Sequence, residues 1–170
     1  VIDGIEACRR FRETPEFSKT FILFLTARSE EYSEIAAFDA GADDFINKPI
    51  KPKAFVSRIA AILKREKKNE TNATVLKAGD LVIDRNTYIV YKGDKEINLP
   101  RKEFELLYFL AANQNKVFNR DELLQKVWGT DVYVLSRTVD VHIRKVRERL
   151  GENYITTIKG VGYKFEYEEI

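Results

Sequence analysis

The sequence predicts a doubly wound α/β domain followed by an α+β domain. Three observations lead to this fold class. Helical and strand patterns alternate along residues 1–65, residues 66–73 are charged and poor in apolar side chains, and residues 74–170 begin with short strand patterns before becoming helical. Alternating helices and strands are typical of parallel α/β sheets, whereas separate runs of strands and helices are typical of α+β folds. We therefore expect the stretch 66–73 to be a linker between two domains.

The α/β pattern begins with the end of a helix and a buried strand. Ile5, Cys8 and Phe11 recur at helical spacing. Residues 21–27, FILFLTA, form a continuous apolar run. Such a run is typical of a strand that is buried on both faces of a parallel sheet, so we expect a central strand here.

A second helix, a second strand and a third helix complete this domain. Ser29 and the acids after it favour a helix start, and Gly41 favours its end. Residues 43–47, DDFIN, predict the next strand, and apolar residues recur at helical spacing over 55–63. The resulting order α-β-α-β-α predicts right-handed βαβ units.

The second domain is predicted to open with a small antiparallel sheet. Short alternating runs over residues 75–100 are broken by Gly79-Asp80, Arg85-Asn86 and Gly93-Asp94. Three helical patterns follow, over 101–113, 120–129 and 136–151, and residues 154–166 predict a hairpin around Gly160 and Gly162.

Composition excludes several classes of protein. The chain is 44% apolar and 33% charged, and no apolar run approaches the roughly 20 residues that span a bilayer. A lone cysteine, Cys8, cannot form an intramolecular disulfide, and together with one histidine it is too little for a zinc site. We therefore expect a protein of the reducing cytoplasm. Because the chain contains no methionine, we also expect it to be part of a longer protein.

The clearest functional signal lies in residues 136–150, SRTVDVHIRKVRERL. This stretch carries five Lys/Arg and two Asp/Glu in a chain whose formal net charge is only +2. As a helix it would bury one apolar face, formed by Val139, Ile143, Val146 and Leu150. The charged side chains would lie on the opposite face and its flanks. We expect Ser136 to cap this helix and Gly151 to end it.

Two interpretations of the basic helix compete. A charged helix face usually only contacts water. Here, however, a helix over 120–128 precedes it and a hairpin with Lys159 near its turn follows it. A helix, a loop and a basic second helix form a helix-turn-helix, whose second helix can enter the major groove of DNA. The context therefore favours a DNA-binding surface over a solvated face.

Three stretches of the second half are LPRKEFELLYFLAANQNKVFNRDELLQKVWG, SRTVDVHIRKVRERLG and YITTIKGVGYKF. Together they resemble the winged-helix effector domain of OmpR/PhoB-type response regulators. The resemblance covers residues 74–167. It implies that 137–150 is the recognition helix, that 154–167 is the wing, and that Lys145 faces a base edge. The DNA-binding residues it implies are Trp128, Arg137, Thr138, His142, Arg144, Lys145, Arg147, Thr157, Lys159 and Tyr163. Trp128 could equally pack in the core, and Asp140 could be a cap partner or a contact.

Residues 1–65 resemble the C-terminal part of the receiver domain of the same proteins. The matching strings are Asp3-Gly4, residues 25–27 (LTA), 41–45 (GADDF) and Lys48-Pro49, whose peptide is often cis in that family. The resemblance implies that Thr26, Phe45 and Lys48 sense phosphorylation. It places the phosphoacceptor aspartate and the magnesium-binding acids before Val1. We therefore expect no cofactor in this chain, and magnesium only if those upstream acids are present.

The resemblance also implies partners. These are double-stranded DNA, a sensor histidine kinase, a second copy of the chain when activated, and RNA polymerase near residues 129–136; no membrane partner is expected. The residues implied for the dimer interface are Ile35, Phe38, Asp44 and Arg58. Two positions depart from the family. A basic residue is common at the position of Glu34, and an acidic residue is common at the position of Ala54. One cross-subunit ion pair that is usual in the family is therefore missing.

We therefore predict a DNA-binding transcriptional response regulator, which is not an enzyme and is switched by phosphorylation of an aspartate upstream of Val1. A phosphotransfer or hydrolytic enzyme would need the missing acids or a Ser/His/Asp or Cys/His constellation, and no such constellation is evident. The remaining alternative is a phosphorylation-independent regulator or a protein-interaction module.

Overall fold

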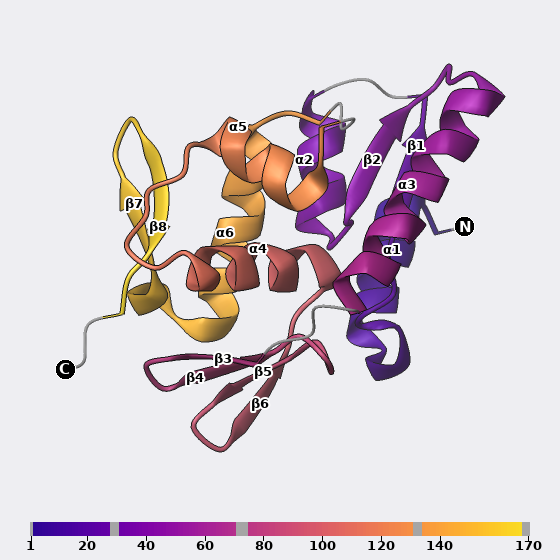
Figure 1. The fold of residues 1–170 in the computed structure, drawn as a ribbon. Coiled ribbons are helices and arrows are strands. Elements are labelled where there is room, and N and C mark those ends of the chain that lie inside the picture. The colour runs from indigo at the N-terminus through magenta and orange to yellow at the C-terminus, as the bar shows by residue number, and fades with distance from the viewer. Residues whose placement is uncertain (1, 28–30, 71–74, 131–133, 168–170) are drawn as a thin grey trace.

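The computed structural model describes residues 2–27, 31–70, 75–130 and 134–167. Two halves are visible in Figure 1, a receiver-like half at the N-terminal end and a second half that ends in a hairpin. The helices α4, α5 and α6 of the second half lie between this hairpin and the first half. None of the described helices combines the length and the apolar character needed to cross a membrane.

The first half has the predicted α-β-α-β-α order. Its elements are α1 (Gly4–Glu13), a short 3-10 turn η1 (Pro15–Phe17), β1 (Leu23–Thr26), α2 (Glu31–Asp39), β2 (Asp44–Asn47) and α3 (Pro52–Glu70). The two strands pair in parallel, with Leu23 opposite Asp44 and Thr26 opposite Asn47. Gly41 ends the region of α2 with a φ of 103°, a conformation that glycine adopts without strain.

Two expectations for this half need correction. The strand over residues 21–27 is shorter than expected and is not buried on both faces, because Leu25 is 40% exposed. Among the described residues β1 pairs with no strand other than β2. The helix α3 continues through Glu70, so residues 66–70 of the expected linker are helical. Residues 71–73 lie outside the described residues, and the boundaries 1–65 and 74–170 stay a prediction.

The second half opens with the expected antiparallel sheet. Its strands are β3 (Val75–Ala78), β4 (Leu81–Asp84), β5 (Ile89–Lys92) and β6 (Lys95–Asn98), paired in chain order. Gly79 and Gly93 lie at two of its turns with φ of 63° and 56°, which explains why glycine is suited to both positions.

Three helical segments and a hairpin follow the sheet. They are α4 (Arg101–Ala112), α5 (Arg120–Leu123) continuing into a π-helical turn η2 (Leu124–Trp128), and α6 (Arg137–Leu150). A short turn η3 (Glu152–Tyr154) leads to the hairpin of β7 (Ile155–Ile158) and β8 (Gly162–Phe165). A capping box that was not predicted starts α5, and in it the side chains of Asn119 and Glu122 each accept the backbone N–H of the other residue.

The apolar face of α6 lies where helical periodicity placed it. Val139, Ile143, Val146 and Leu150 are all buried in the main core, together with α4 residues such as Leu107 and Leu110. Ser136 precedes the helix as expected, but its side chain makes no capping hydrogen bond because its backbone is already helical. Gly151 ends the helix with a φ of 102°.

A second apolar cluster joins the two halves. Ala37, Phe38, Ala42 and Phe45 of the first half pack with Val134, and Val141 of α6 lies against them. The outer face of α6 is therefore partly covered by the receiver-like half. This contact was not predicted from the sequence.

Candidate nucleic-acid interface

The charged face of α6 lies opposite its buried apolar face. The side chains of Arg137 and Arg144 are 70% and 53% exposed, whereas that of Lys145 is 23% exposed. Arg144 also pairs with Glu148 one turn further along the helix, at 2.7 Å. Such exposed pairs contribute little to stability, so these side chains are free to exchange partners at low cost.

One flank of α6 is tied to α5 and to the hairpin. Asp140 accepts hydrogen bonds from Arg120 Nε and from the Tyr163 hydroxyl, both at 2.6 Å. Arg147 donates to the Ile155 carbonyl at 2.6 Å and to Thr157 Oγ1 at 2.8 Å. This network fixes the angle between the helix and the hairpin. Asp140 is therefore a structural partner, and Arg147 joins the helix to the first hairpin strand.

The hairpin is anchored along β8 and exposed around its turn. Phe118 and Tyr163 exchange two backbone hydrogen bonds, each of 2.9 Å. The Tyr163 side chain is buried within the network on α6, and Thr157 and Lys159 are exposed near the turn. The tip, rather than Tyr163, is the part of the hairpin that can meet a ligand.

The other flank of α6 is buried against the receiver-like half. Thr138 and His142 are 1% and 3% exposed. The His142 ring lies between the rings of Phe38, at 5.4 Å between centroids, and Trp128, at 4.8 Å. Burial in this aromatic site lowers the pKa of His142 to about 4, so the ring is neutral at pH 7. Trp128 is also buried, and its indole N–H donates to the Asp43 carbonyl at 2.9 Å.

Acidic side chains of α2 bind the outer face of α6. Glu31 pairs with Arg137 at 2.9 Å. Glu34 accepts hydrogen bonds from the Leu135 backbone N–H at 2.7 Å and from Thr138 Oγ1 at 3.1 Å. Asp39 pairs with Arg144 and, at 3.2 Å, with Lys145. These three acids are called the acidic face of α2 below. In the sequence, this contact is indicated only by the spacing of the three acids, which places them on one side of a helix.

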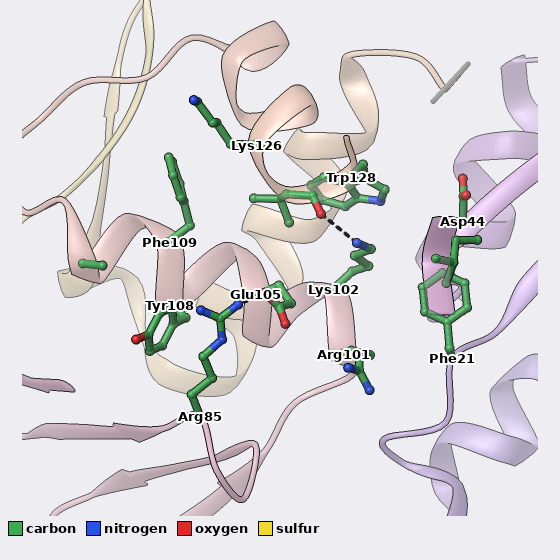
Figure 2. Close-up of a pocket in the computed structure, with 13 residues that line it drawn as sticks. Phe21, Asp44, Arg85, Arg101, Lys102, Glu105, Tyr108, Phe109, Lys126 and Trp128 are labelled. Carbon is green, nitrogen blue, oxygen red and sulfur yellow. Dashed lines mark hydrogen bonds and ion pairs between the residues drawn. The ribbon is translucent and has the colours of Figure 1, made fainter. Parts of the chain in front are cut away.

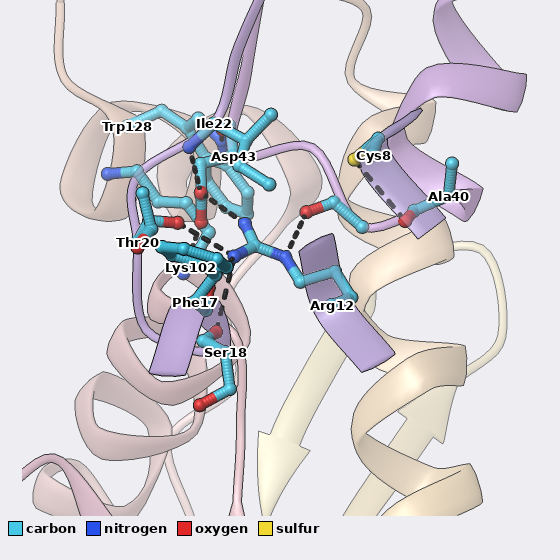
Figure 3. Close-up of polar contacts among 11 residues, drawn as sticks. Cys8, Arg12, Phe17, Ser18, Thr20, Ile22, Ala40, Asp43, Lys102 and Trp128 are labelled. Carbon is cyan, nitrogen blue, oxygen red and sulfur yellow. Dashed lines mark hydrogen bonds and ion pairs between the residues drawn. The ribbon is translucent and has the colours of Figure 1, made fainter. Parts of the chain in front are cut away.

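A buried carboxylate, Asp43, fixes a second contact between the halves (Figure 3). It pairs with Arg12 at 2.7 Å within the receiver-like half and accepts the backbone N–H of Lys102, in the first turn of α4, at 3.0 Å. Arg12 also donates to four backbone carbonyls, of Phe17, Ser18, Thr20 and Gly41. Desolvation raises the pKa of Asp43, and the Arg12 guanidinium opposes that shift.

The junction between the halves also contains a cavity of about 360 Å³. Figure 2 shows Phe21 and Asp44 on the receiver side facing Lys102, Glu105 and Trp128 across it. Lys102 Nζ donates to the Val127 carbonyl at 2.7 Å at its rim. The halves therefore meet through local polar and apolar contacts around open space rather than through one continuous packed core.

The residues implied in phosphorylation sensing lie at the carboxyl ends of the two strands. Thr26 ends β1, and Lys48 follows β2 and donates its backbone N–H to the Thr26 carbonyl at 2.6 Å. The Lys48–Pro49 peptide is cis, as the family resemblance suggested. Phe45 is buried and packs on Phe38 at 6.3 Å between ring centroids. Their sensing role stays a prediction.

The expectation that magnesium needs acids upstream of Val1 stays a prediction. No three His, Cys, Asp or Glu side chains among the described residues lie close enough together to hold a metal ion. The groups at the strand ends, a hydroxyl and an ammonium, are not magnesium ligands of the usual kind.

The four dimer candidates are all engaged within this chain to some degree. Asp44 pairs with Arg58 at 2.9 Å, Phe38 is buried against His142, and Ile35 is half-buried. Of the segment implied to meet RNA polymerase, residues 131–133 lie outside the described residues. Neither surface is tested by these contacts, and both stay predictions.

Comparison with known proteins agrees with the fold. Residues 1–60 match the response regulator receiver domain, and residues 94–165 match the family described as transcriptional regulatory protein, C terminal. The phosphate regulon transcriptional regulatory protein PhoB of Rhizobium meliloti (strain 1021) is 41% identical over 169 residues, covering 97% of this chain and 74% of that protein. The transcriptional regulatory protein ResD of Bacillus subtilis (strain 168) is 40% identical over 176 residues, covering 96% and 72%.

Two solved structures are also similar. A serine mutant of RitR superposes with a TM-score of 0.76 at 29% identity, over 97% of this chain and 76% of that chain. The DNA-binding domain of response regulator AdeR, in complex with an intercistronic region, superposes with a TM-score of 0.50 at 29% identity, over 54% of this chain and 99% of that chain. The first match extends over both halves, and the second covers only the DNA-binding half.

A receiver domain followed by a winged helix-turn-helix defines a two-component response regulator with a DNA-binding transcription regulatory domain. This chain belongs to the OmpR/PhoB-type response regulators.

Proposed function

We propose that α6 reads DNA in the major groove and that the hairpin β7–β8 contacts an adjacent groove or phosphates. The observation that carries this proposal is the division of α6 into a buried apolar face and an outer face with Arg137, Arg144 and Lys145. A groove-reading helix needs long hydrogen-bond donors held on a rigid support. The anchoring of α6 to the hairpin through Arg147 provides that support.

The side chains divide by their surroundings. Arg144 and Lys145 are proposed to face base edges, and Arg137, Thr157 and Lys159 are proposed to bind phosphates. Thr138 and His142 are covered by Glu34 and Phe38 of α2 in this arrangement, so their proposed contacts require the halves to separate. Trp128 lies in the main core of the DNA-binding half and bonds to Asp43. Tyr163 and Arg147 act first through the network that fixes the hairpin, and any DNA contact by them is secondary.

Phosphorylation of an aspartate upstream of Val1 by a sensor histidine kinase is proposed as the switch. Thr26 and Lys48 are suited to sense it, because a hydroxyl and an ammonium at adjacent strand ends can bind an acyl phosphate. Phe45 contacts Phe38 of α2, which contacts His142 of α6. This row of rings offers a physical route from the strand ends to the DNA-reading helix.

Further partners rest on the family resemblance alone. A homodimer of the activated protein would place two wings on adjacent half-sites and raise avidity. A contact with RNA polymerase near residues 129–136, a cytoplasmic location and the absence of enzymatic activity belong to the same proposal. A phosphorylation-independent regulator is the alternative, and it would keep the same DNA-reading surface.

Substitutions on α6 test the DNA-reading role. Two duplexes are compared, one selected from a random library by the whole chain and one of mixed sequence. Lys145→Ala should reduce the preference for the selected duplex by about tenfold, because a good base contact contributes roughly 1–3 kcal/mol of discrimination. Arg137→Ala should weaken binding to both duplexes alike and lower the salt slope by about one.

Lys53→Ala is a matched control, because Lys53 is an exposed lysine on α3 in the receiver-like half. It should bind both duplexes as the wild type does. If the double variant Lys145→Ala/Arg137→Ala binds the selected duplex as tightly as the wild type at equal salt, α6 is not the reading helix.

A further inference from the structure

We propose that the cavity at the junction between the halves is a binding site for a small planar aromatic carboxylate. The cavity has a volume of about 360 Å³, and residues of both halves line it (Figure 2). Pockets of this size often bind small molecules, and many of them lie between domains. The described lining includes no residue of α6. The site therefore adds a second kind of ligand, which goes beyond the proposed reading of DNA.

One face of α4 forms a long wall of the cavity. Residues three or four positions apart lie on the same face of a helix. The lining residues of α4 follow this spacing, as in Lys102, Glu105, Phe109 and Ala112. In Figure 2 the side chains on this face run from Lys102, near the receiver-like half, to Phe109 further along the helix. A cavity that follows a helix in this way suits an elongated ligand.

Aromatic rings give the cavity much of its apolar surface. Tyr108 and Phe109 belong to α4, Phe21 precedes β1, and Trp128 ends η2. The first three are partly exposed, whereas Trp128 is buried and contributes from the core side. Aromatic rings favour offset-stacked and edge-to-face contacts with other rings. A ligand with one or two fused rings would find such partners along the cavity.

The charge of the lining favours an anion. Four basic and two acidic side chains give it a formal net charge of +2, and they are Arg85, Arg101, Lys102, Lys126, Asp44 and Glu105. Asp44 is already paired at 2.9 Å with Arg58, which is not among the described lining residues. A cleft lined mainly by one sign of charge concentrates ligands of the opposite sign. The cavity should therefore prefer a carboxylate over a neutral or cationic compound of the same shape.

Arg85 is the side chain best suited to bind the carboxylate. Its guanidinium pairs with Glu105 at 3.1 Å and lies over the Tyr108 ring, 4.6 Å from the centroid. The Nε atom of Arg85 is buried and has no hydrogen-bond partner among the described residues. A buried donor without a partner is costly, and a guanidinium binds a carboxylate through two parallel N–H bonds. A small rotation would let Arg85 bind a ligand carboxylate while it stays against Tyr108.

A pair of compounds that differ in charge tests the site. 2-Naphthoate and its neutral counterpart 2-naphthamide are titrated into the whole chain by isothermal titration calorimetry, at pH 7 and about 50 mM salt. 2-Naphthoate should bind about tenfold more tightly, because hydrogen bonds to a charged group are the stronger ones. Equal affinities, or no saturable binding of 2-naphthoate at millimolar concentrations, would overturn the proposal. No DNA is present, so failure here leaves the proposed role of α6 standing.

Trp128 reports where the compound binds. It is the one tryptophan of the chain, so its indole N–H gives a single indole signal in a proton–nitrogen correlation spectrum. This N–H donates to the Asp43 carbonyl at 2.9 Å, in the wall of the cavity. 2-Naphthoate should shift the signal with the same half-saturation as in calorimetry. Binding that leaves the signal in place would lie elsewhere on the protein and would contradict the proposal.

Arg85→Gln tests the proposed carboxylate contact. It should lower the affinity for 2-naphthoate about tenfold and leave the affinity for 2-naphthamide unchanged, since only the charged compound uses the guanidinium. Lys95→Gln is the matched control, because Lys95 is an exposed residue of β6 outside the described lining. It should bind 2-naphthoate within about twofold of the wild type. Equal losses in the two variants would overturn the proposal, because net charge alone would then explain the binding.

A second variant tests the cavity without removing a charge, since Arg85 also holds Glu105. Ala112 lines the cavity and is exposed at the end of α4. Ala112→Phe should therefore fold normally and fill part of the space. It should weaken the binding of 2-naphthoate and 2-naphthamide severalfold alike. Wild-type affinity of Ala112→Phe for both compounds would show that they do not occupy this cavity.

Discussion

At the scale of single residues, burial determines what each polar group of the interface can do. His142 illustrates this best, because the resemblance assigned it to a DNA phosphate and the structure encloses it between Phe38 and Trp128. A ring whose pKa is lowered to about 4 carries no charge at pH 7. In this arrangement His142 therefore acts as an apolar ring of the junction between the halves.

The buried His142 predicts a stability that depends on pH. Its pKa is about 4 in the folded chain and near the ordinary value of 6.5 when unfolded. The contribution of neutral His142 to the free energy of unfolding is therefore complete above pH 6.5, and it is lost as the pH falls towards 4. Between pH 7.5 and 5 the loss should be roughly 2 kcal/mol. In His142→Gln, which keeps a hydrogen-bond donor but does not titrate, this part of the loss should disappear.

Urea unfolding of both proteins at the two pH values measures the effect. Glu103 opposes it, because burial raises the pKa of this carboxyl to about 7 and the folded chain then gains stability as the pH falls. Both proteins contain Glu103, so its contribution cancels in the difference between them. Identical losses in the wild type and in His142→Gln would show that His142 is not held neutral by burial.

At the scale of elements, the local patterns of the sequence predicted the helices and strands well. Alternating helical and strand patterns identified the order of α1 to α3, and helical periodicity identified the buried face of α6, since both depend on near neighbours in the chain. The contact of α2 with α6 joins Glu34 to Thr138, 104 residues apart. No local pattern encodes which acidic helix will meet which basic one, so this part of the site was not predicted.

Other predictions were wrong for different reasons. The capping bond expected from Ser136 is absent, and an unforeseen capping box starts α5. The exposure of Leu25 depends on which strands lie beside β1, and apolar periodicity does not report strand neighbours. The residues named for DNA contact were chosen by family resemblance, which describes positions on a helix but not what covers them.

The attachment of the hairpin predicts a contrast between two glycines. A Cβ atom on Gly162 would lie 2.0 Å from the carbonyl oxygen of Phe118, which belongs to the backbone and cannot turn away. Gly162→Ala should therefore destabilise the fold by about 3 kcal/mol and loosen the wing. Gly160 has open space around it but a φ of 76°. Gly160→Ala should cost only about 1 kcal/mol.

Thermal unfolding of the two variants measures the contrast. Gly162→Ala should have the lower melting temperature of the two and should also lose affinity for DNA, because the hairpin strand β8 is displaced from Phe118. Equal melting temperatures would mean that the hairpin is not held against Phe118 as described.

At the scale of the whole molecule, several contacts among the described residues join the halves. They include the acidic face of α2 on α6, Asp43 with the start of α4 and with Trp128, and Lys19 Nζ, which donates to the Thr87 carbonyl at 2.8 Å. A cavity of about 360 Å³ lies at the same junction. Contacts of this kind allow the halves to part without unfolding the main core of the DNA-binding half, because that core contains no residue of the receiver-like half in the part of the chain that the structure describes.

Hydrogen–deuterium exchange of the whole chain, with and without a duplex selected from a random library, tests whether α6 reads DNA. Exchange reports local opening of backbone hydrogen bonds. Peptides from α6 and the hairpin should become more protected on DNA binding, while peptides from α2 should become less protected as its acids lose their partners. Protection that appears elsewhere, with α6 unchanged, would contradict the assignment of α6 as the DNA-reading helix.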